Sequence, residues 1–216
     1  MRAAFDARVV TPEVVRFVRA CQRRAPCVLV GGAALSGAFL AHRLSRDIDL
    51  FFRSPAELRS LADVLRQAAD DVGGTVVLLQ DSPEFVRAEL RLGEQRLEVD
   101  LAVDATPELA PRETIEGVVV ASLVDLRAAK LTCLLSRSEP RDLVDVYFLE
   151  RAGFAAEADL PLALQKDAGV DPAVLSWLLG QFPTEPMPQL LQPLTAEELR
   201  AFRDQLRERI KRAATS

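Results

Sequence analysis

Hydrophobic and polar positions along the chain change period several times within the first 150 residues. Apolar residues three or four apart, usually after a proline or a capping side chain, predict helices over 12–24, 33–44, 55–71, 122–136 and 140–152. Alternating or short β-favouring runs predict strands over 27–30, 47–52, 75–79, 86–92, 97–103 and 117–121. Helices and strands interleaved in this way are typical of an α/β protein with a mixed sheet.

Some of the predicted strands carry a more detailed expectation. The run at 75–79 contains no charged residue, so we expect it to be buried. The strands at 86–92 and 97–103 alternate strictly and are separated by a turn at 93–94, which predicts a hairpin. Within that hairpin the alternation places Asp100 on the polar face.

The last quarter of the chain has a helical pattern only. An Asp-Pro start at 171–172 and a capping box at 195–198 predict helices on either side of a proline-rich segment at 183–193. We therefore expect an α/β (α+β) core over residues 1–152 and a helical C-terminal region over residues 153–216.

Composition limits the possible functions. The 216 residues suffice to bury a core without disulfides, and the three cysteines are odd in number and widely spaced. The chain has a single histidine, His42, so no zinc-binding spacing exists, and we expect reduced thiols in a cytoplasmic protein with His42 in a structural role. With a net charge of −5 the chain lacks the overall positive charge that is typical of nucleic-acid-binding proteins. Contact with RNA would therefore require a local arginine cluster.

One uncharged run, at 25–41, follows two arginines in the manner of a signal peptide. It is shorter than the roughly 20 residues that a spanning helix needs. It also contains three glycines, and an amphipathic segment precedes it. We expect no membrane segment and a soluble, unprocessed protein.

The most informative stretch begins with Gly31 and Gly32 and continues, after a helix, with Arg43-Leu44-Ser45-Arg46-Asp47-Ile48-Asp49-Leu50-Phe51-Phe52. Carboxylates two residues apart on a strand point the same way, with Cα atoms about 6–7 Å apart, close enough to share a pair of divalent ions. Two adjacent glycines let backbone N–H groups approach a triphosphate without a side chain in the way. On a neighbouring strand, Asp100 is the best placed third carboxylate, and Asp104 is second. The pattern predicts phosphoryl chemistry.

Each of these elements also has a simpler interpretation. A Gly-Gly turn is usually only a turn, and an Asp-x-Asp on a strand is at least as often a solvated edge. The ordered combination of strand, glycine pair, helix and Ser-x-Asp-x-Asp is more specific than any one part. No Walker lysine follows the glycines and no GxGxxG occurs, so neither a P-loop nor a dinucleotide fingerprint explains the pattern.

A second block comprises Asp125-Leu126-Arg127-Ala128-Ala129-Lys130, then Arg137, then Arg141-Asp142-Leu143-Val144-Asp145-Val146-Tyr147-Phe148-Leu149. Together the two blocks, over about residues 28–150, resemble the nucleotidyltransferase superfamily with the polymerase-β-like fold. Within it they resemble the AbiEii-type toxin nucleotidyltransferases of bacterial toxin–antitoxin systems. The resemblance implies metal binding by Asp47 and Asp49, triphosphate contact by Gly32, phosphate binding by Lys130, and a functional carboxylate at Asp142.

The residues of the second block have structural alternatives as well. On a helical wheel Lys130 falls among leucines, where a packed stem with a snorkelling ammonium is an alternative to phosphate binding. Asp142 and Asp145 lie in the first turns of a helix, where carboxylates complement the helix dipole. We assign a functional role to Asp142 and a structural role to Asp145. Further candidates for triphosphate or acceptor contact are Arg43, Arg46 and Arg141.

We therefore expect a nucleotidyltransferase that uses Mg²⁺ or Mn²⁺ to transfer a nucleoside monophosphate from an NTP. The expected catalytic residues are Asp47, Asp49, Asp100, Lys130 and Asp142, with metal bound by the first three. The expected nucleotide-binding residues are Gly31, Gly32, Arg46 and Lys130. The resemblance implies a toxin that acts on RNA, at the 3′ end of tRNA, with an antitoxin protein as partner.

Two other functions remain open at this point. A small molecule such as an aminoglycoside could be the acceptor, with the same aspartates at the site. A catalytically silent fold could instead bind nucleotide or a protein partner. Third carboxylates lying far from Asp47 and Asp49 would favour the silent fold.

Overall fold

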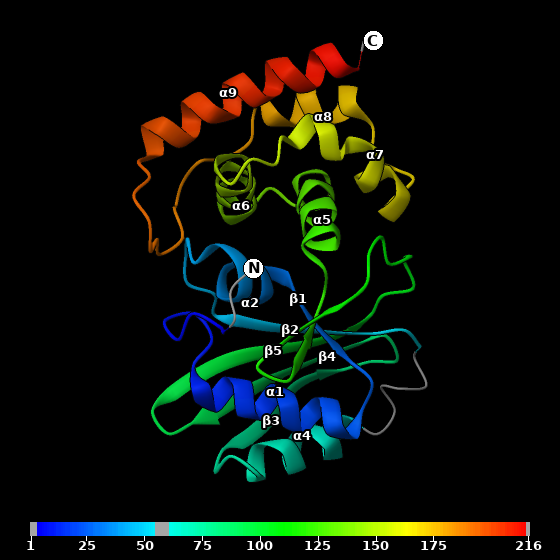
Figure 1. Cartoon of the computed structure of the whole chain (residues 1–216), viewed down its shortest axis with the longest axis vertical. Helices are drawn as coiled ribbons and strands as arrows, with labels where there is room; N and C mark the ends of the chain where they lie inside the picture. The colour runs from blue at the N-terminus through cyan, green and yellow to red at the C-terminus, as the bar shows by residue number, and fades with distance from the viewer. Residues whose placement is uncertain (1–3, 55–60, 215–216) are drawn as a thin grey trace. The chain divides into compact units, whose positions relative to one another are not determined.

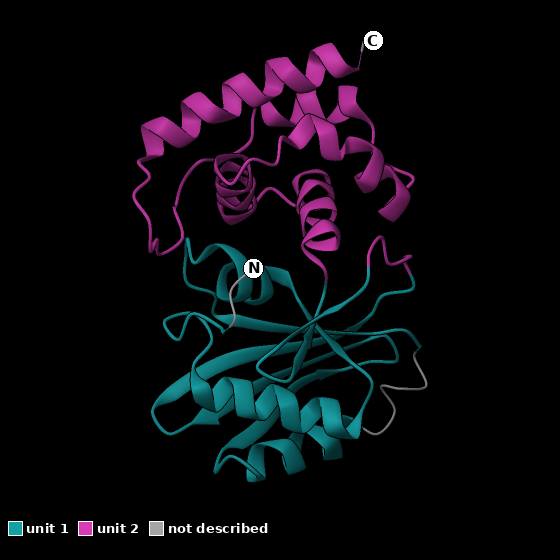
Figure 2. Cartoon of the chain, viewed as in Figure 1, with its two compact units in different colours: residues 1–105, 111–121 teal, residues 106–110, 122–216 magenta. Residues whose placement is uncertain are grey.

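The computed structural model describes residues 4–54 and 61–214 (Figure 1). It forms two compact units, residues 1–105 with 111–121 and residues 106–110 with 122–216 (Figure 2). The division falls after residue 121, earlier than the boundary expected at 152. The two helices expected to belong to the core pack instead with the C-terminal helices, and the units follow that packing.

Unit 1 is built on a mixed seven-stranded sheet in the order β3-β4-β5-β2-β1-β7-β6. Its strands are β1 (Val28–Val30), β2 (Asp47–Phe52), β3 (Thr75–Asp81), β4 (Phe85–Leu92), β5 (Gln95–Val103), β6 (Glu113–Ile115) and β7 (Val118–Val120). The β1–β7 and β2–β5 pairs are parallel and the other pairs are antiparallel. The predicted α/β class with a mixed sheet is confirmed.

Two helices cover one face of this sheet, α1 (Pro12–Arg24) and α4 (Leu61–Asp70) (Figure 1). The Thr11 hydroxyl caps α1 by accepting from the Val14 amide, as expected for a Thr-Pro start. The expected beginning of α4, over 55–60, lies outside the described residues. Strand alternation matches this covering: Ile48, Leu50 and Phe52 of β2 are buried, and the aspartates between them are only partly buried.

The helix predicted over 33–44 ends earlier than expected. Helix α2 (Gly31–Ala34) continues as a turn of π-helix, η1 (Leu35–Leu40), and stops at Ala41, which has a left-handed backbone with φ of 49°. The Ser36 hydroxyl donates to the Arg43 carbonyl at 2.6 Å and accepts from the Arg43 amide. These bonds turn the chain toward β2, so residues 41–44 leave the helix.

Strand β3 is an edge strand, and the expectation that 75–79 would be buried was wrong. Val77 is 42% exposed and Leu79 is 57% exposed. The sheet ends at β3, and Val77 lies opposite Glu89 on the face that α1 and α4 leave uncovered. The hairpin of β4 and β5 is confirmed, with its turn at 93–94. Strand β6, which was not expected, pairs with β7 across a tight turn at Glu116 and Gly117.

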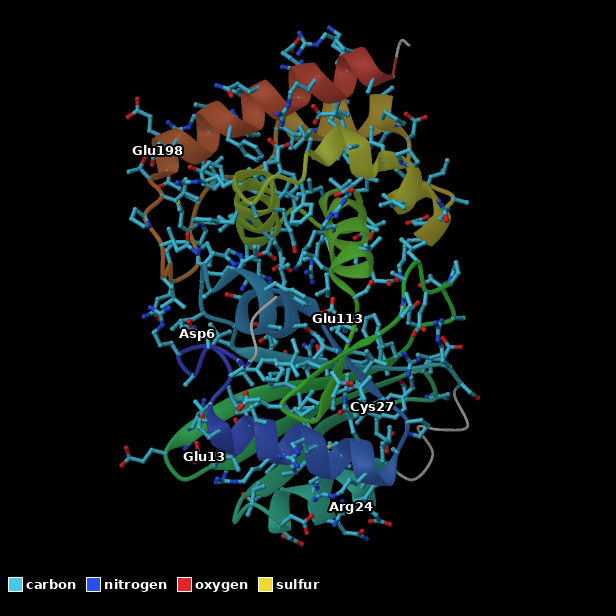
Figure 3. The ribbon with its side chains drawn as sticks, in the orientation of Figure 1. Asp6, Glu13, Arg24, Cys27, Glu113 and Glu198 are labelled. Atoms are coloured by element: carbon cyan, nitrogen blue, oxygen red, sulfur yellow. The ribbon has the colours of Figure 1, made fainter. Side chains whose placement is uncertain are left out.

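Unit 2 is helical, with α5 (Leu123–Ser136), α6 (Pro140–Arg151), α7 (Ala156–Lys166), α8 (Pro172–Leu179) and α9 (Ala196–Ala213). The predicted starts are confirmed: Ser122 caps α5, Asp171 caps α8, and Thr195 with Glu198 forms the capping box of α9. Figure 3 labels Glu198 at the start of α9. Within residues 4–54 and 61–214, no helix is both long and apolar enough to cross a membrane.

Candidate functional site

The sheet of unit 1 gathers four carboxylates on the face that α1 and α4 leave uncovered. Asp47 and Asp49 lie two residues apart on β2 and share that face. The parallel neighbour β5 sets Glu98 opposite Asp47 and Asp100 opposite Asp49. Asp104, the second candidate for a third carboxylate, follows the end of β5 and donates its amide to Phe52 at the far end of β2. The structure thus places Asp100, and not Asp104, beside Asp49.

The glycine pair lies directly against these residues. Gly31 has a left-handed backbone with φ of +66°, and a Cβ atom added there would lie 1.8 Å from Asp49 Oδ2. A Cβ added at Gly32 would lie 2.5 Å from Arg43 Nη2 and 3.1 Å from Ser45 Oγ. Only glycine therefore allows the turn after β1 to approach Asp49 so closely.

The arginines before β2 occupy different surroundings. Arg43 is only 3% exposed, and its Nη1 donates to the Leu44 carbonyl at 2.9 Å. Its guanidinium packs directly against Gly32. Arg46 is exposed, next to Asp47 in the sequence. His42 is fully buried, in agreement with a structural role.

An arginine that the sequence analysis did not single out, Arg87 on β4, holds Asp100. Its Nε and Nη2 donate to the two oxygens of Asp100 at 2.8 and 2.7 Å, and its Nε lies 3.2 Å from Glu98 Oε1. Hydrogen bonding to Asp100 raises the pKa of Arg87 further above its usual value. A signal was available, because the turn at 93–94 pairs position 92 with 95 and therefore Arg87 with Asp100.

Two of the three predicted metal ligands are suited to bind a divalent ion in this arrangement. Carboxylate oxygens suit Mg²⁺, which is commonly held by one or two carboxylates together with substrate phosphates. Asp47 and Asp49 match that description. In the part of the chain that the structure describes, however, no three His, Cys, Asp or Glu side chains are grouped closely enough to hold a metal ion. The third predicted ligand, Asp100, has both oxygens bonded to Arg87.

Unit 2 contains a second charged cluster, formed by Lys130 and Arg137 of the α5 segment with Asp142 and Asp145 of α6. The Lys130 ammonium lies 3.0 Å from Asp142 Oδ1 and 2.7 Å from Asp145 Oδ2. Arg137 donates from Nε to Asp142 Oδ2 at 2.8 Å and from Nη2 to Oδ1 at 3.0 Å. Burial alone would lower the pKa of Arg137, but its hydrogen bond to Asp142 and the charges of Cys133, Asp142 and Glu139 together raise it.

Burial distinguishes the members of this cluster. Both aspartates are fully buried, and the Lys130 side chain is 4% exposed, so its ammonium does not snorkel to solvent. The Arg137 side chain is 40% exposed, so Arg137 is the more accessible of the two cations in this cluster. Asp145, to which the sequence analysis assigned a structural role, is the second carboxylate of α6 that pairs with the Lys130 ammonium.

The two clusters define a class of protein. A mixed sheet that carries an Asp-x-Asp strand against a glycine turn, followed by helices with a buried lysine and aspartates, is the arrangement of a nucleotidyltransferase. The family model described as "Nucleotidyl transferase AbiEii toxin, Type IV TA system" matches residues 16–216. The chain therefore belongs to the AbiEii family of nucleotidyltransferase toxins and is a nucleotidyltransferase.

Solved structures share this fold. JHP933 from Helicobacter pylori is 21% identical with a TM-score of 0.60, over 93% of this chain and 90% of that one. A nucleotidyltransferase from H. pylori, described as putative, is 20% identical with a TM-score of 0.61, over 93% of each chain. MenT4, a nucleotidyltransferase toxin from Mycobacterium tuberculosis, is 15% identical with a TM-score of 0.55, over 94% of this chain and 86% of that one. No protein with a curated description matches this chain.

Proposed function

We propose that this nucleotidyltransferase uses Mg²⁺ or Mn²⁺ to transfer a nucleoside monophosphate from an NTP to RNA, at the 3′ end of tRNA, as the toxin of a toxin–antitoxin pair. The observation that carries the proposal is the contact between the glycine turn and Asp49, which leaves no room for a Cβ atom at Gly31. Glycine at this position lets the backbone approach the proposed metal ligand and keeps a side chain out of the space beside it, where a triphosphate would bind.

Asp47 and Asp49 bind the metal in this proposal. When bound, the ion neutralises charge on the triphosphate and aligns the α-phosphate with the attacking hydroxyl. The glycine pair presents backbone N–H groups to the phosphates without an intervening side chain. The proposal rests on the shared face of the two aspartates and on the family of the chain.

Lys130 contributes a positive charge for phosphate binding, and Asp142 and Asp145 hold its ammonium in place. A lysine has three rotatable donors on a flexible stem, so two buried carboxylates restrict it to one orientation. Asp142 remains the proposed functional carboxylate of unit 2. The exposed guanidinium of Arg137 donates to both of its oxygens and fixes its orientation.

The proposal of an RNA acceptor rests on the family resemblance of the sequence and on exposed arginines in a chain whose net charge is −5. Arg46 beside the aspartates and Arg137 in unit 2 are both exposed. If they track phosphates, each neutralised phosphate adds about 0.7 to the slope of log affinity against log salt for single strands. A flat salt response of RNA binding would contradict this part of the proposal.

The test of the whole proposal is transfer of label. The purified chain is incubated with each α-labelled NTP, Mg²⁺ or Mn²⁺, and total bacterial RNA, and the RNA is resolved by size. We expect label at tRNA 3′ ends, and at least about a 100-fold loss with Asp49→Ala, since each tenfold in rate is about 1.4 kcal/mol and a lost ion removes several kcal/mol of charge stabilisation. The control is Asp104→Ala, which removes a carboxylate from the far end of β2.

Two results would contradict the proposal at different levels. Near wild-type transfer by Asp49→Ala would contradict the assignment of Asp49 as a metal ligand. Label on a small molecule or a protein, with none on RNA, would contradict RNA as the acceptor but would still agree with a nucleotidyltransferase reaction. For the partner, expression of the active chain should slow bacterial growth, and co-expression of a neighbouring antitoxin gene should relieve it.

A further inference from the structure

Asp49, Asp100 and Arg87 form one row across three neighbouring strands of unit 1. The β2–β5 register sets Asp49 opposite Asp100, and the β5–β4 register sets Asp100 opposite Arg87. Neighbouring strands lie about 4.8 Å apart. Asp100 therefore stands between a proposed metal ligand and a guanidinium, on the face of the sheet that carries the glycine turn.

The Arg87 fork competes with a metal ion for Asp100. Its two parallel N–H bonds reach both carboxylate oxygens at 2.7 and 2.8 Å, the geometry that makes arginine–carboxylate pairs strong and specific. A divalent ion on the same carboxylate would lie beside a fixed positive charge and would be repelled by it. Asp100 is the less exposed partner, at 16% against 38% for the arginine, so the guanidinium covers the carboxylate more than the carboxylate covers it.

The local charges explain why a cation is needed at this position. Like charges opposite one another on adjacent strands destabilise a sheet. Asp47 faces Glu98 and Asp49 faces Asp100, so four carboxylates occupy two adjacent rows. Arg87 reaches both Glu98 and Asp100, and Asp47 also acts on it electrostatically. A second metal ion would supply the same neutralisation in a site with three carboxylate ligands.

We propose that Arg87 takes the place of a metal ion at Asp100, so that the chain binds one divalent ion through Asp47 and Asp49. Asp100 is then not a metal ligand but a positioning residue, which holds the guanidinium on the triphosphate-binding face. The inference rests on the proposed function in one respect, the metal bound by Asp47 and Asp49. It differs from the expectation that three carboxylates share the metal.

The experiment counts bound Mn²⁺ on the full chain from the electron paramagnetic resonance signal of free Mn²⁺, with no nucleotide present. We expect one ion on the wild type. Arg87→Met removes the guanidinium and releases Asp100, so it should bind a second ion or bind the first at least tenfold more tightly. Arg87→Met combined with Asp100→Asn should return to the wild-type count and affinity, because the released ligand is gone.

The matched control is Arg91→Met. Arg91 lies on the same strand and the same face, four residues away, and pairs with Glu89 rather than with a proposed metal-site residue. Its loss should leave Mn²⁺ binding unchanged. Circular dichroism and thermal melting check that each variant is folded. If Arg87→Met does not fold, Arg87→Gln tests the same charge with a polar side chain in place.

The outcomes separate this inference from the proposed function. One ion on the wild type that Asp49→Ala abolishes, with no change in Arg87→Met, would show an ordinary structural ion pair and overturn the inference alone. Two ions on the wild type, reduced to one by Asp100→Asn, would also overturn it. No Mn²⁺ on the wild type, or binding that survives Asp49→Ala, would remove the metal site itself and the inference with it.

Discussion

Two glycines with nearly the same backbone conformation have different surroundings in this protein. Gly31 has φ of +66° and its added Cβ would clash with the Asp49 carboxylate. Gly93, in the β4–β5 turn, has φ of +59° and no atom within 4 Å of the added Cβ. Substitution of each of these glycines therefore distinguishes two effects. At Gly93 it strains the backbone alone, and at Gly31 it also displaces a functional side chain.

At the residue scale we predict that Gly31→Ala abolishes transfer, with a loss of at least about 100-fold, because Asp49 must move away from its position. Gly93→Ala has the same left-handed strain, about 1–2 kcal/mol, and should lower the unfolding free energy by that amount without loss of transfer. Denaturant unfolding and labelled-NTP transfer measure the two effects. Full activity in Gly31→Ala would mean that the position of Asp49 is not needed.

The Lys130 cluster leads to a second prediction at this scale. The Lys130→Met substitution keeps the apolar stem and removes the charge. It also affects stability, because the variant leaves Asp142 and Asp145 buried without the ammonium. Breaking a buried ion pair in this way costs about 3–5 kcal/mol.

We therefore expect Lys130→Met to weaken NTP binding and to lower the unfolding free energy by roughly 3 kcal/mol. Lys130→Met combined with Asp145→Asn should recover part of the stability, since one uncompensated charge is removed, but none of the NTP affinity. Denaturant unfolding and equilibrium NTP binding give the two quantities. Unchanged stability in the single variant would contradict the coupling of these three side chains.

At the scale of elements, the start of α5 connects a distant segment to unit 2. Asp125 accepts from the Leu109 and Ala110 amides at 3.0 and 3.2 Å, and Lys166 of α7 lies 2.6 Å from its Oδ1. These bonds explain why residues 106–110 belong with unit 2 although unit 1 continues at 111. Burial alone would raise the pKa of Asp125, but Lys166, Ser122 and the Leu109 amide together lower it.

This connection predicts a pH dependence of stability. A carboxyl whose pKa is lower in the folded state stabilises the fold above its unfolded value of about 3.9 and loses that effect as the pH falls through the folded value. Asp125→Asn should therefore be less stable than the wild type at pH 7, and the difference should shrink below about pH 4. Thermal melting across pH 2.5–7 measures it, with Asp63→Asn, an exposed aspartate of α4, as control. A difference that does not change with pH would exclude this role for the Asp125 charge.

At the scale of the whole molecule, the three cysteines are free thiols in two different compact units. Burial raises the pKa of Cys27 to about 12 and also raises those of Cys21 and Cys133. The thiolate is the reactive form, so these groups are protected in the folded chain.

We predict that native protein at pH 8 reacts slowly with Ellman's reagent and that all three thiols react rapidly after unfolding in guanidinium chloride. The expected burst on unfolding is three thiols per chain, the number in the sequence. The course of reaction also reports global stability, because both units must open to expose every thiol. Rapid reaction of a thiol in the native state would contradict its burial.

Much of this protein was determined by local sequence. The caps at Thr11, Ser122 and Asp171 and the alternation of β2 depend on residues within a few positions of one another, so their side chains were sufficient to predict them. The glycine pair and the Asp-x-Asp strand predicted phosphoryl chemistry for the same reason, and the nucleotidyltransferase expectation came from the family that the two blocks resemble. Local chemistry also placed Lys130 on a buried helix face.

The tertiary structure decided what depends on distant partners. The burial of β3 depends on what lies beside it in the sheet. The residues of β3 themselves do not reveal this. Lys130 proved to be bound by carboxylates from the next helix, and the availability of Asp100 depended on an arginine 13 residues away. Charge pairs of this kind are set by strand register and helix packing, because a side chain's electrostatic surroundings come mainly from elements that are remote in sequence.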